Sequence, residues 1–176
     1  VTVAKGTPEQ TVKHVEYTKG LPTKVIDENG HNWLYHYDAD GNRDSATDPL
    51  GRVTASSYDG NHQLLSRTLP SGFATTHTYD TAGNLKTTTR MFTQAQPETT
   101  TYGYDTSGFG ELVSRSDQLG HGVTYGYDGN GNLTSQTTQL GFKTTFGYNA
   151  AGFVTSKVTP KGNVTGGTPL TYTTTY

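Results

Sequence analysis

The fold of this chain is decided by a short phrase that recurs along it, most clearly in Tyr127-Asp128-Gly129-Asn130-Gly131-Asn132. Close copies begin at Tyr37 and Tyr79, and weaker copies begin at Tyr58, Tyr104 and Tyr148. A fixed internal period is the signature of one small structural unit that is stacked many times. We therefore interpret the chain as an array of repeats, which directs attention away from catalysis and toward surface, enclosure and adhesion.

The repeats are evenly spaced. The step between repeat tyrosines is 21 residues from Tyr37 to Tyr58, from Tyr58 to Tyr79 and from Tyr127 to Tyr148. It is 25 residues from Tyr79 to Tyr104 and 23 residues from Tyr104 to Tyr127. We expect the additional residues in loops such as 90–96 and 163–168, because lengthening a loop costs little entropy. A glycine or proline seven residues before each tyrosine keeps the same register: Gly30, Gly51, Gly72, Pro97, Gly120, Gly141 and Pro169.

The same register predicts how the chain is organised. An earlier copy of the repeat begins at Tyr17, and Tyr176 has the place of a tyrosine that opens a further copy. We expect an incomplete leading repeat over residues 1–16 and a repeat array over residues 17–176 that is truncated at the start of a further repeat. On this interpretation the sequence is a segment of a longer array.

The composition favours ordered β-structure. Only 30% of the 176 residues are hydrophobic, but 12 are tyrosine and 22 are glycine. Disordered chains are poor in aromatic and β-branched residues, whereas this sequence is rich in tyrosine and threonine. No stretch shows the 3.6-residue period of a helix, and glycine or proline interrupts every window.

Charge and cysteine content exclude several classes of partner. The net charge is −2 and the 13 basic residues are scattered, which argues against a nucleic-acid partner. No apolar run approaches the ~18 residues of a membrane-spanning helix, so we expect no membrane span in this segment. The sequence has no cysteine, so disulfides and thiolate metal sites make no contribution.

One repeat has the pattern of a β-hairpin. Residues 123–127 are rich in β-formers, and Tyr125 and Tyr127 share one face of a strand. In the next four residues, Asp128 and Gly131 have the first and fourth places of a type I turn followed by a left-handed residue. Residues 133–138 return as the second strand. The turn that begins at Asp59 has His62 in the fourth place, where a positive φ is tolerated less easily than at glycine.

Hairpins of this size are marginal alone, so neighbouring hairpins are expected to pair edge to edge. The fold class is then all-β: an array of hairpin repeats in one long, curved antiparallel sheet. We expect the aromatic pairs to line up as cross-strand ladders and to form the core, with Trp33 filling a local gap. The aromatic pairs are Tyr35 and Tyr37, Tyr102 and Tyr104, Tyr125 and Tyr127, and Phe146 and Tyr148. Aliphatic residues lie six positions after a repeat tyrosine at Leu64, Leu85, Leu133 and Val154.

The phrase in Tyr127–Leu133, together with the preceding Thr-Tyr-Gly-Tyr strand, resembles the YD repeats of Rhs proteins. These repeats are found in bacterial polymorphic toxins, wall-associated proteins, insecticidal toxin-complex subunits and teneurins. The resemblance covers residues 17–176 and is specific because the copies are phased. It implies a β-sheet that spirals into a hollow shell and, in the toxin members, an enclosed C-terminal effector polypeptide. The C-terminal core of the family, with its self-cleaving Asp-Pro segment, has no counterpart in this sequence.

Three groups of residues are candidates for a site. The turns at residues 38–42 and 128–132 have spaced acidic and amide oxygens like a calcium loop, but they lack the glycine and glutamate at positions six and twelve of an EF-hand. We interpret them as turns, with weak calcium binding as the alternative. Asp48-Pro49 resembles the cleavage segment superficially, and its place between two hairpins favours a turn. The six histidines, namely His14, His31, His36, His62, His77 and His121, show no metal-pair spacing, and His31 and His121 are interpreted as turn residues.

We assign no catalytic, cofactor-binding or metal-binding residue, because a repeated carboxylate serves the backbone of each copy and does not define one active site. The glycosylation sequons at Asn132 and Asn163 are interpreted as unmodified in a bacterial protein. Tyrosine rings could stack on glycans, but packing within the array is the favoured interpretation. The open sheet edge near Tyr176 is a candidate for edge-to-edge self-association.

These observations lead to one functional hypothesis with two alternatives. The chain is expected to be a non-enzymatic structural segment of a secreted or cell-surface bacterial protein, contributing to a β-shell that encloses a toxin or other cargo. Its partners would be the adjacent repeats of the same longer chain and the enclosed domain. The alternatives are an adhesion or carbohydrate-binding surface module and a self-assembling fibre component.

Overall fold

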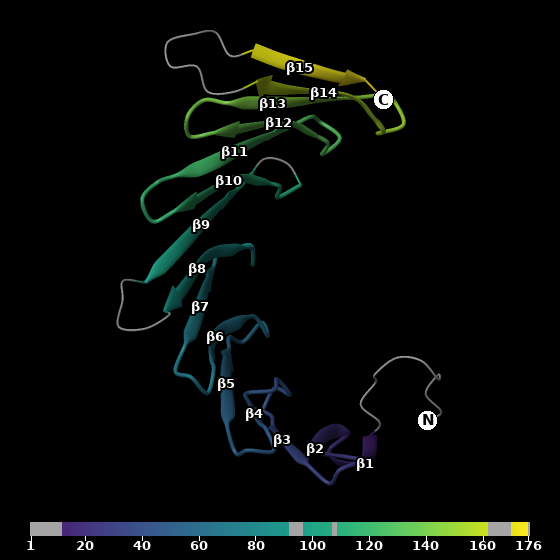
Figure 1. The fold of residues 1–176 in the computed structure, drawn as a ribbon, viewed down its shortest axis with the longest axis vertical. Coiled ribbons are helices and arrows are strands. Elements are labelled where there is room, and N and C mark those ends of the chain that lie inside the picture. Colours follow the sequence, from purple (N-terminus) through teal and green to yellow (C-terminus); the bar gives the residue numbers. More distant parts are fainter. Residues whose placement is uncertain (1–11, 92–96, 107–108, 162–169, 176) are drawn as a thin grey trace. The chain divides into compact units, whose positions relative to one another are not determined.

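The computed structural model describes residues 12–91, 97–106, 109–161 and 170–175. Figure 1 shows that the chain runs through antiparallel strands, and the described residues contain no helix. Fifteen strands form one sheet in which their order is their order along the chain. The all-β, hairpin-repeat fold class expected from the sequence is confirmed. Because no helix is found among the described residues, none is long and apolar enough to cross a membrane.

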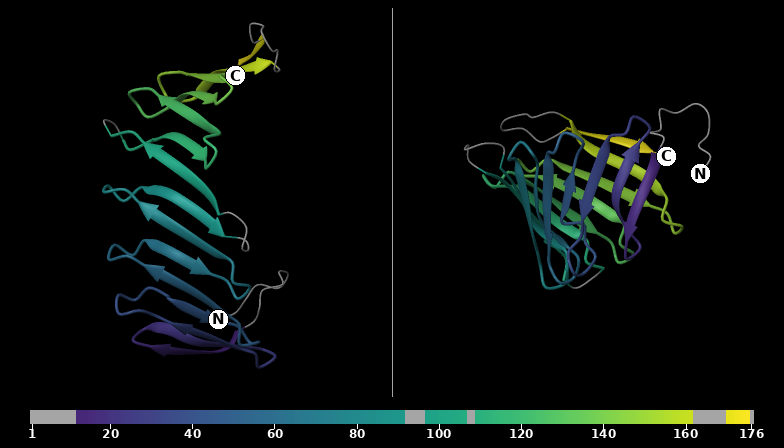
Figure 2. Two further views of the ribbon diagram at one scale, coloured as in Figure 1. Left: turned by 90° about the vertical axis from the view of Figure 1, so that its left-hand side faces the viewer. Right: turned by 90° about the horizontal axis from the view of Figure 1, so that it is seen from below.

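The contacts between residues divide the chain into two units. The described residues of the first unit are 12–77, 89–91 and 97, and those of the second unit are 78–88, 98–106, 109–161 and 170–175. The strands are β1 (Val12–Thr18), β2 (Leu21–Asp27), β3 (Asn32–His36), β4 (Ser45–Thr47), β5 (Val53–Tyr58), β6 (Leu64–Thr68), β7 (Ala74–Tyr79), β8 (Leu85–Met91), β9 (Glu98–Tyr104), β10 (Leu112–Asp117), β11 (Gly122–Tyr127), β12 (Leu133–Thr138), β13 (Lys143–Tyr148), β14 (Val154–Lys161) and β15 (Leu170–Thr175). Figure 2 shows the same strands from two further sides.

The turns form as the sequence predicts. Gly131 has a φ of 80° and its N–H donates to the carbonyl of Asp128, which closes the type I turn with a left-handed fourth residue. His62 has the same place in its repeat with a φ of 63°. The Tyr17 copy is also a hairpin, but a shorter turn joins β1 to β2. Its two central residues, Lys19 and Gly20, have φ values of 51° and 81°, as in a type I′ turn.

The strand register corrects the expectation of aromatic ladders. In the second unit Tyr125 lies opposite Gln136, Tyr102 lies opposite Arg115, and Phe146 lies opposite Lys157. In each of these hairpins, the aromatic residue two positions before the repeat tyrosine is therefore paired with a polar or cationic residue of the second strand. The repeat tyrosines themselves lie opposite aliphatic residues, as Tyr127 does with Leu133. A register shift between Gly126 and Tyr127 allows this pairing, and the expectation of directly opposed aromatic rings was wrong.

The expectation of a buried tyrosine core also needs correction. No hydrophobic residue among the described residues is fully buried; the repeat tyrosines from Tyr37 to Tyr148 are half-buried, and Tyr17 is exposed. Directly paired residues point to the same side of a sheet, so the second unit has an aromatic face and a small-residue face. The small-residue face places Gly126 opposite Ser135. A Cβ at Gly126 would lie 2.7 Å from the Ser135 Oγ, so a larger residue there would require the Ser135 hydroxyl to move, and in other copies Ser57 and Thr78 have this place and bond the paired hydroxyl.

Candidate functional surface

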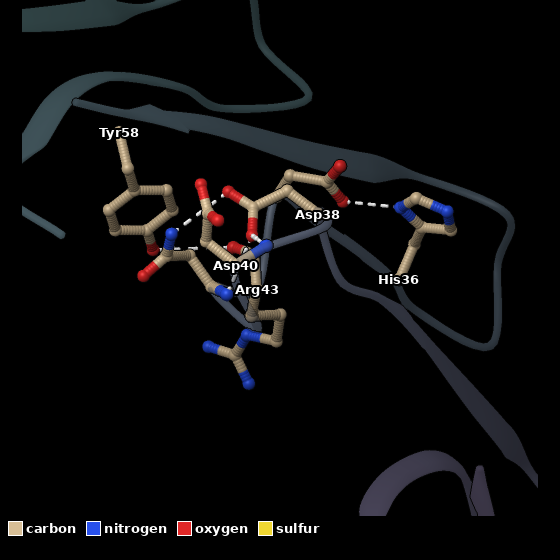
Figure 3. A network of polar contacts seen from close by, with 7 residues as sticks. His36, Asp38, Asp40, Arg43 and Tyr58 are labelled. Atoms are coloured by element: carbon tan, nitrogen blue, oxygen red, sulfur yellow. Dashed lines mark hydrogen bonds and ion pairs between the residues drawn. The ribbon is translucent and has the colours of Figure 1, made fainter. Parts of the chain in front are cut away.

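The repeat tyrosine joins neighbouring hairpins through a hydrogen bond from its hydroxyl group. The Tyr148 hydroxyl, on β13, donates to the backbone carbonyl of Leu133, on β12, at 2.9 Å. Three other tyrosines do the same at 3.0–3.2 Å, each to the carbonyl 15 residues earlier: Tyr37 to Pro22, Tyr58 to Arg43 and Tyr127 to Leu112. Figure 3 shows the bond from Tyr58 to Arg43. We call these bonds the tyrosine ties.

The electrostatic setting of Tyr127 keeps its phenol in the donor form. Burial raises the pKa of Tyr127 above its usual value, and the nearby charge of Glu111 raises it further. Burial likewise raises the pKa of Tyr104. Tyr104 nevertheless makes no hydroxyl hydrogen bond within the part of the chain that the structure describes. It therefore provides an internal comparison for the tied tyrosines.

The aspartate of the repeat closes its own turn. The Asp128 Oδ1 accepts the N–H of Asn130 and of Asn132, both at 2.9 Å, and its Oδ2 accepts the Asn132 side-chain amide at 2.9 Å. The side-chain and backbone hydrogen bonds from Asn132 hold the pKa of Asp128 below its usual value. The asparagine of the phrase thus has a role that sequence reasoning missed, since it donates to the aspartate four residues before it.

The same arrangement recurs at other turns. At Asp38 the Oδ1 accepts the Asp40 and Asn42 N–H groups at 3.0 and 2.8 Å, and the Oδ2 accepts the Asn42 amide at 2.9 Å. Figure 3 shows this cluster beside Tyr58. Hydrogen bonds from Asn42 lower the pKa of Asp38. In both candidate calcium loops the carboxylate of the first residue, Asp38 or Asp128, therefore accepts hydrogen bonds from its own turn.

The turns at the opposite ends of the hairpins use the same carboxylate geometry with a different side chain. His31 donates its backbone N–H to the Asp27 Oδ1 at 2.9 Å, and its Nδ1 lies 2.8 Å from the Asp27 Oδ2. His121 and Asp117 repeat this pair at 2.8 and 2.9 Å. Both histidines are turn residues, as predicted. In the part of the chain that the structure describes, no group of three or more His, Asp or Glu residues could hold a metal ion.

The remaining sequence candidates lie apart from one another. Asp48, before Pro49, closes the turn between β4 and β5, with its Oδ1 accepting the Arg52 N–H at 2.9 Å and its Oδ2 accepting the Arg52 Nε–H at 2.6 Å. His36 pairs with Asp44 at 2.6 Å, and the His62 Nδ1 lies 2.8 Å from the Asn42 Oδ1. His14 is exposed, and burial lowers the pKa of His77. Asn132 donates to Asp128, and Asn163 lies outside the described residues.

The fold and its ties define a tandem β-hairpin repeat protein. The family model for the RHS Repeat matches residues 18–53, 58–93, 107–143 and 127–164, which is well over half of the chain. The chain therefore belongs to the RHS-repeat family, and the resemblance drawn from the sequence is confirmed. No curated protein matches the chain by sequence.

Solved structures with the same fold come from toxin complexes. The Photorhabdus luminescens Tc holotoxin pore, carrying a TccC3 D651A mutation, superimposes with a TM-score of 0.69 at 17% identity over 89% of this chain. The complexes TcdB2-TccC3-Cdc42 and TcdB2-TccC3 give TM-scores of 0.69 and 0.68 at 16% and 17% identity, again over 89% of this chain. The matched region is 9% of each of those chains. At this identity the likeness establishes the fold.

Proposed function

We propose that the chain is a non-catalytic structural segment of an exported bacterial Rhs-repeat protein and forms part of a β-shell that encloses a toxin or other cargo polypeptide. The observation that carries this proposal is the tyrosine tie, which joins the hairpins of Tyr37, Tyr58, Tyr127 and Tyr148 to the hairpin before each of them through an equivalent backbone carbonyl. An array joined in this way can be lengthened hairpin by hairpin, because each repeat depends mainly on its neighbours. The likeness to segments of toxin complexes supports enclosure as the purpose of such an array.

The repeated chemistry supports a non-catalytic role. The turn carboxylates accept hydrogen bonds from their own turns, as Asp38 and Asp128 do. A catalytic carboxylate or histidine is instead expected to have a geometry that no other copy shares. The chain is therefore proposed to act through its shape, as a wall that separates an enclosed polypeptide from proteases and partners.

Protease protection in the complete gene product tests this proposal. If the array encloses cargo, limited digestion of the native protein should leave a protected segment that lacks the repeat, and mild urea should expose that segment. Phenylalanine substitution of the four tied tyrosines should expose the protected segment at a lower urea concentration than in the wild type. Digestion to the repeat array alone, with every other segment degraded at once in the native protein, would refute enclosure.

A carbohydrate-binding surface is the second candidate. A depression of about 630 Å³ on the second unit is lined by Tyr125, Tyr127, Phe109 and the acidic groups of Glu111 and Asp128. Aromatic rings beside carboxylates can stack on sugar rings and accept hydrogen bonds from their hydroxyls. Saturable binding of a neutral oligosaccharide that Tyr125→Ala abolishes without loss of β-structure would favour this function. Filament formation that increases with protein concentration would favour the third candidate, a fibre component joined through the outer edges of β1 and β15.

A further inference from the structure

The aromatic face of the second unit has a central band of alternating rings and long polar side chains. The register places Tyr102 opposite Arg115, Tyr125 opposite Gln136 and Phe146 opposite Lys157. Arg115 also lies opposite Val123, which shares a face with Tyr125, so the pairs are on the same side of the sheet. We call these six residues the central band: Tyr102, Arg115, Tyr125, Gln136, Phe146 and Lys157.

The two cations of the central band are available to a partner. Among the described residues, the Arg115 guanidinium has no hydrogen-bond or ion-pair partner and its side chain is exposed. The Lys157 Nζ lies 5.8 Å from the centre of the Phe146 ring, and none of the described carboxylates forms an ion pair with it. Some cations of the first unit are paired with carboxylates, as Lys24 is with Glu16 at 3.1 Å and Arg52 is with Asp48 at 2.6 Å. The central band instead has uncompensated positive charge beside half-exposed rings, an arrangement that Arg43 also has over the Tyr35 ring, at 5.2 Å, in the first unit.

Carboxylates are confined to the strand ends on either side of this band. Glu98 lies at the start of β9 and Asp117 at the end of β10, while Glu111 and Asp128 lie at the opposite ends of the hairpins. A nucleic-acid strand carries a charge at every nucleotide, so these flanking carboxylates would repel it. A polypeptide with a few separated carboxylates can place them at Arg115 and Lys157 and keep them away from the carboxylates at the strand ends. This favours a polypeptide partner over a polyanion.

The spacing of the cations sets the spacing of the groups that they would bind. Arg115 is on β10 and Lys157 is on β14, four strands away, which corresponds to roughly 19 Å across the strands at ~4.8 Å per strand. The register also displaces Lys157 by about four residues, or ~13 Å, along the strand direction. The two cations are then roughly 23 Å apart, and an extended peptide advances ~3.3 Å per residue, so two carboxylates about seven residues apart would reach both cations. The side chains between them would lie on Tyr125 and Phe146, and the Gln136 amide could bond their backbone.

We propose that the central band binds an extended acidic segment of a polypeptide, with carboxylates about seven residues apart at Arg115 and Lys157. This proposal rests on the proposed function, because the enclosed polypeptide would be the natural source of such a segment. It gives the array a chemical preference for its cargo in addition to a shape.

Fluorescence anisotropy with the whole chain tests the proposal. The probe is a labelled peptide of about thirteen residues with two glutamates about seven positions apart and leucine between them, and the control peptide has lysine in place of each glutamate. We expect saturable binding of the glutamate peptide that weakens as salt is added. The double variant Arg115→Glu, Lys157→Glu should weaken this binding roughly tenfold or more, because like charges then face each other. Lys143→Glu is the matched control, since Lys143 pairs with Thr137 on the small-residue face.

Several outcomes would overturn the proposal. These are no binding of the glutamate peptide, equal binding of the lysine peptide, an equal loss from Lys143→Glu, or tighter binding of a heparin oligosaccharide than of the peptide. Circular dichroism shows whether the double variant has kept its strands, and Arg115→Gln, Lys157→Gln provides a milder version that removes charge without reversing it. Because the peptide assay needs no cargo, its failure is distinct from failure of protease protection in the complete gene product.

Discussion

Removing one hydroxyl group from a tied tyrosine measures what the tie contributes. In Tyr127→Phe the ring keeps its place opposite Leu133, and only the 3.0 Å bond from the hydroxyl to the Leu112 carbonyl is lost. A buried hydrogen bond contributes about 1 kcal/mol net. The half-exposed setting allows water to reach the freed carbonyl, so we expect the loss to stay near about 1 kcal/mol. This corresponds to about a fivefold change in the local opening equilibrium.

Hydrogen exchange followed by mass spectrometry resolves such a local effect. Repeat arrays distribute their stability over neighbouring units, so exchange should become about fivefold faster in β10 and β11 and change little in distant strands. Tyr104→Phe is the matched control, because the Tyr104 hydroxyl has no partner among the described residues. Phenylalanine at all four tied positions should lower the free energy of unfolding by roughly 4 kcal/mol, since well-separated sites are nearly additive. Equal effects of Tyr104→Phe and Tyr127→Phe would refute the assignment of stability to the hydroxyl bond.

The turns provide three further predictions. Asp128→Ala should lower the thermal midpoint and Asp128→Asn should lower it less, because asparagine can still accept the two N–H groups, as Asn149 does at 3.0 Å, but loses the carboxylate that accepts the Asn132 amide; an equal loss in the two variants, seen by scanning fluorimetry, would contradict this. The pKa of Asp128 is lowered in the folded chain, so its stabilising contribution is present above about pH 4 and is lost as the pH falls through the folded pKa. An NMR titration that finds the Asp128 pKa raised would reverse the sign. Gly152→Ala should cost about 1 kcal/mol in urea unfolding because φ is 81° there, whereas His62→Gly should change little, since relief of its positive φ is offset by loss of the bond to Asn42.

The turns could be predicted from the sequence because turn chemistry is local. The type I geometry follows from Asp at the first place and Gly at the fourth, and both lie within four residues of each other. Even the exception at His62 was predictable, since histidine accepts a positive φ more readily than most residues. The strand positions followed once the turns were placed, because each turn fixes where its two strands begin.

The strand partners and the tyrosine ties could not be predicted in the same way. The tie ends on a backbone carbonyl, so the accepting residue can be Pro22, Arg43 or Leu112 without any common side chain. The pairing of Tyr125 with Gln136 depends on the register shift beside Gly126, which one sequence does not reveal. The only available signal was the constant interval of 15 residues, and an interval alone does not say which atoms meet.

The position of an insertion determines whether a tie survives. The loop between Asp105 and Glu111 contains additional residues, but it precedes Leu112, so Tyr127 keeps its interval of 15 residues and its bond. Before Tyr104 the additional residues lie between the two hairpins, and 19 residues separate Tyr104 from Leu85, which has the place of the accepting residue. Tyr104 has no hydroxyl partner among the described residues. Lengthening within a hairpin thus leaves the array tied, whereas lengthening between hairpins removes the bond that joins them.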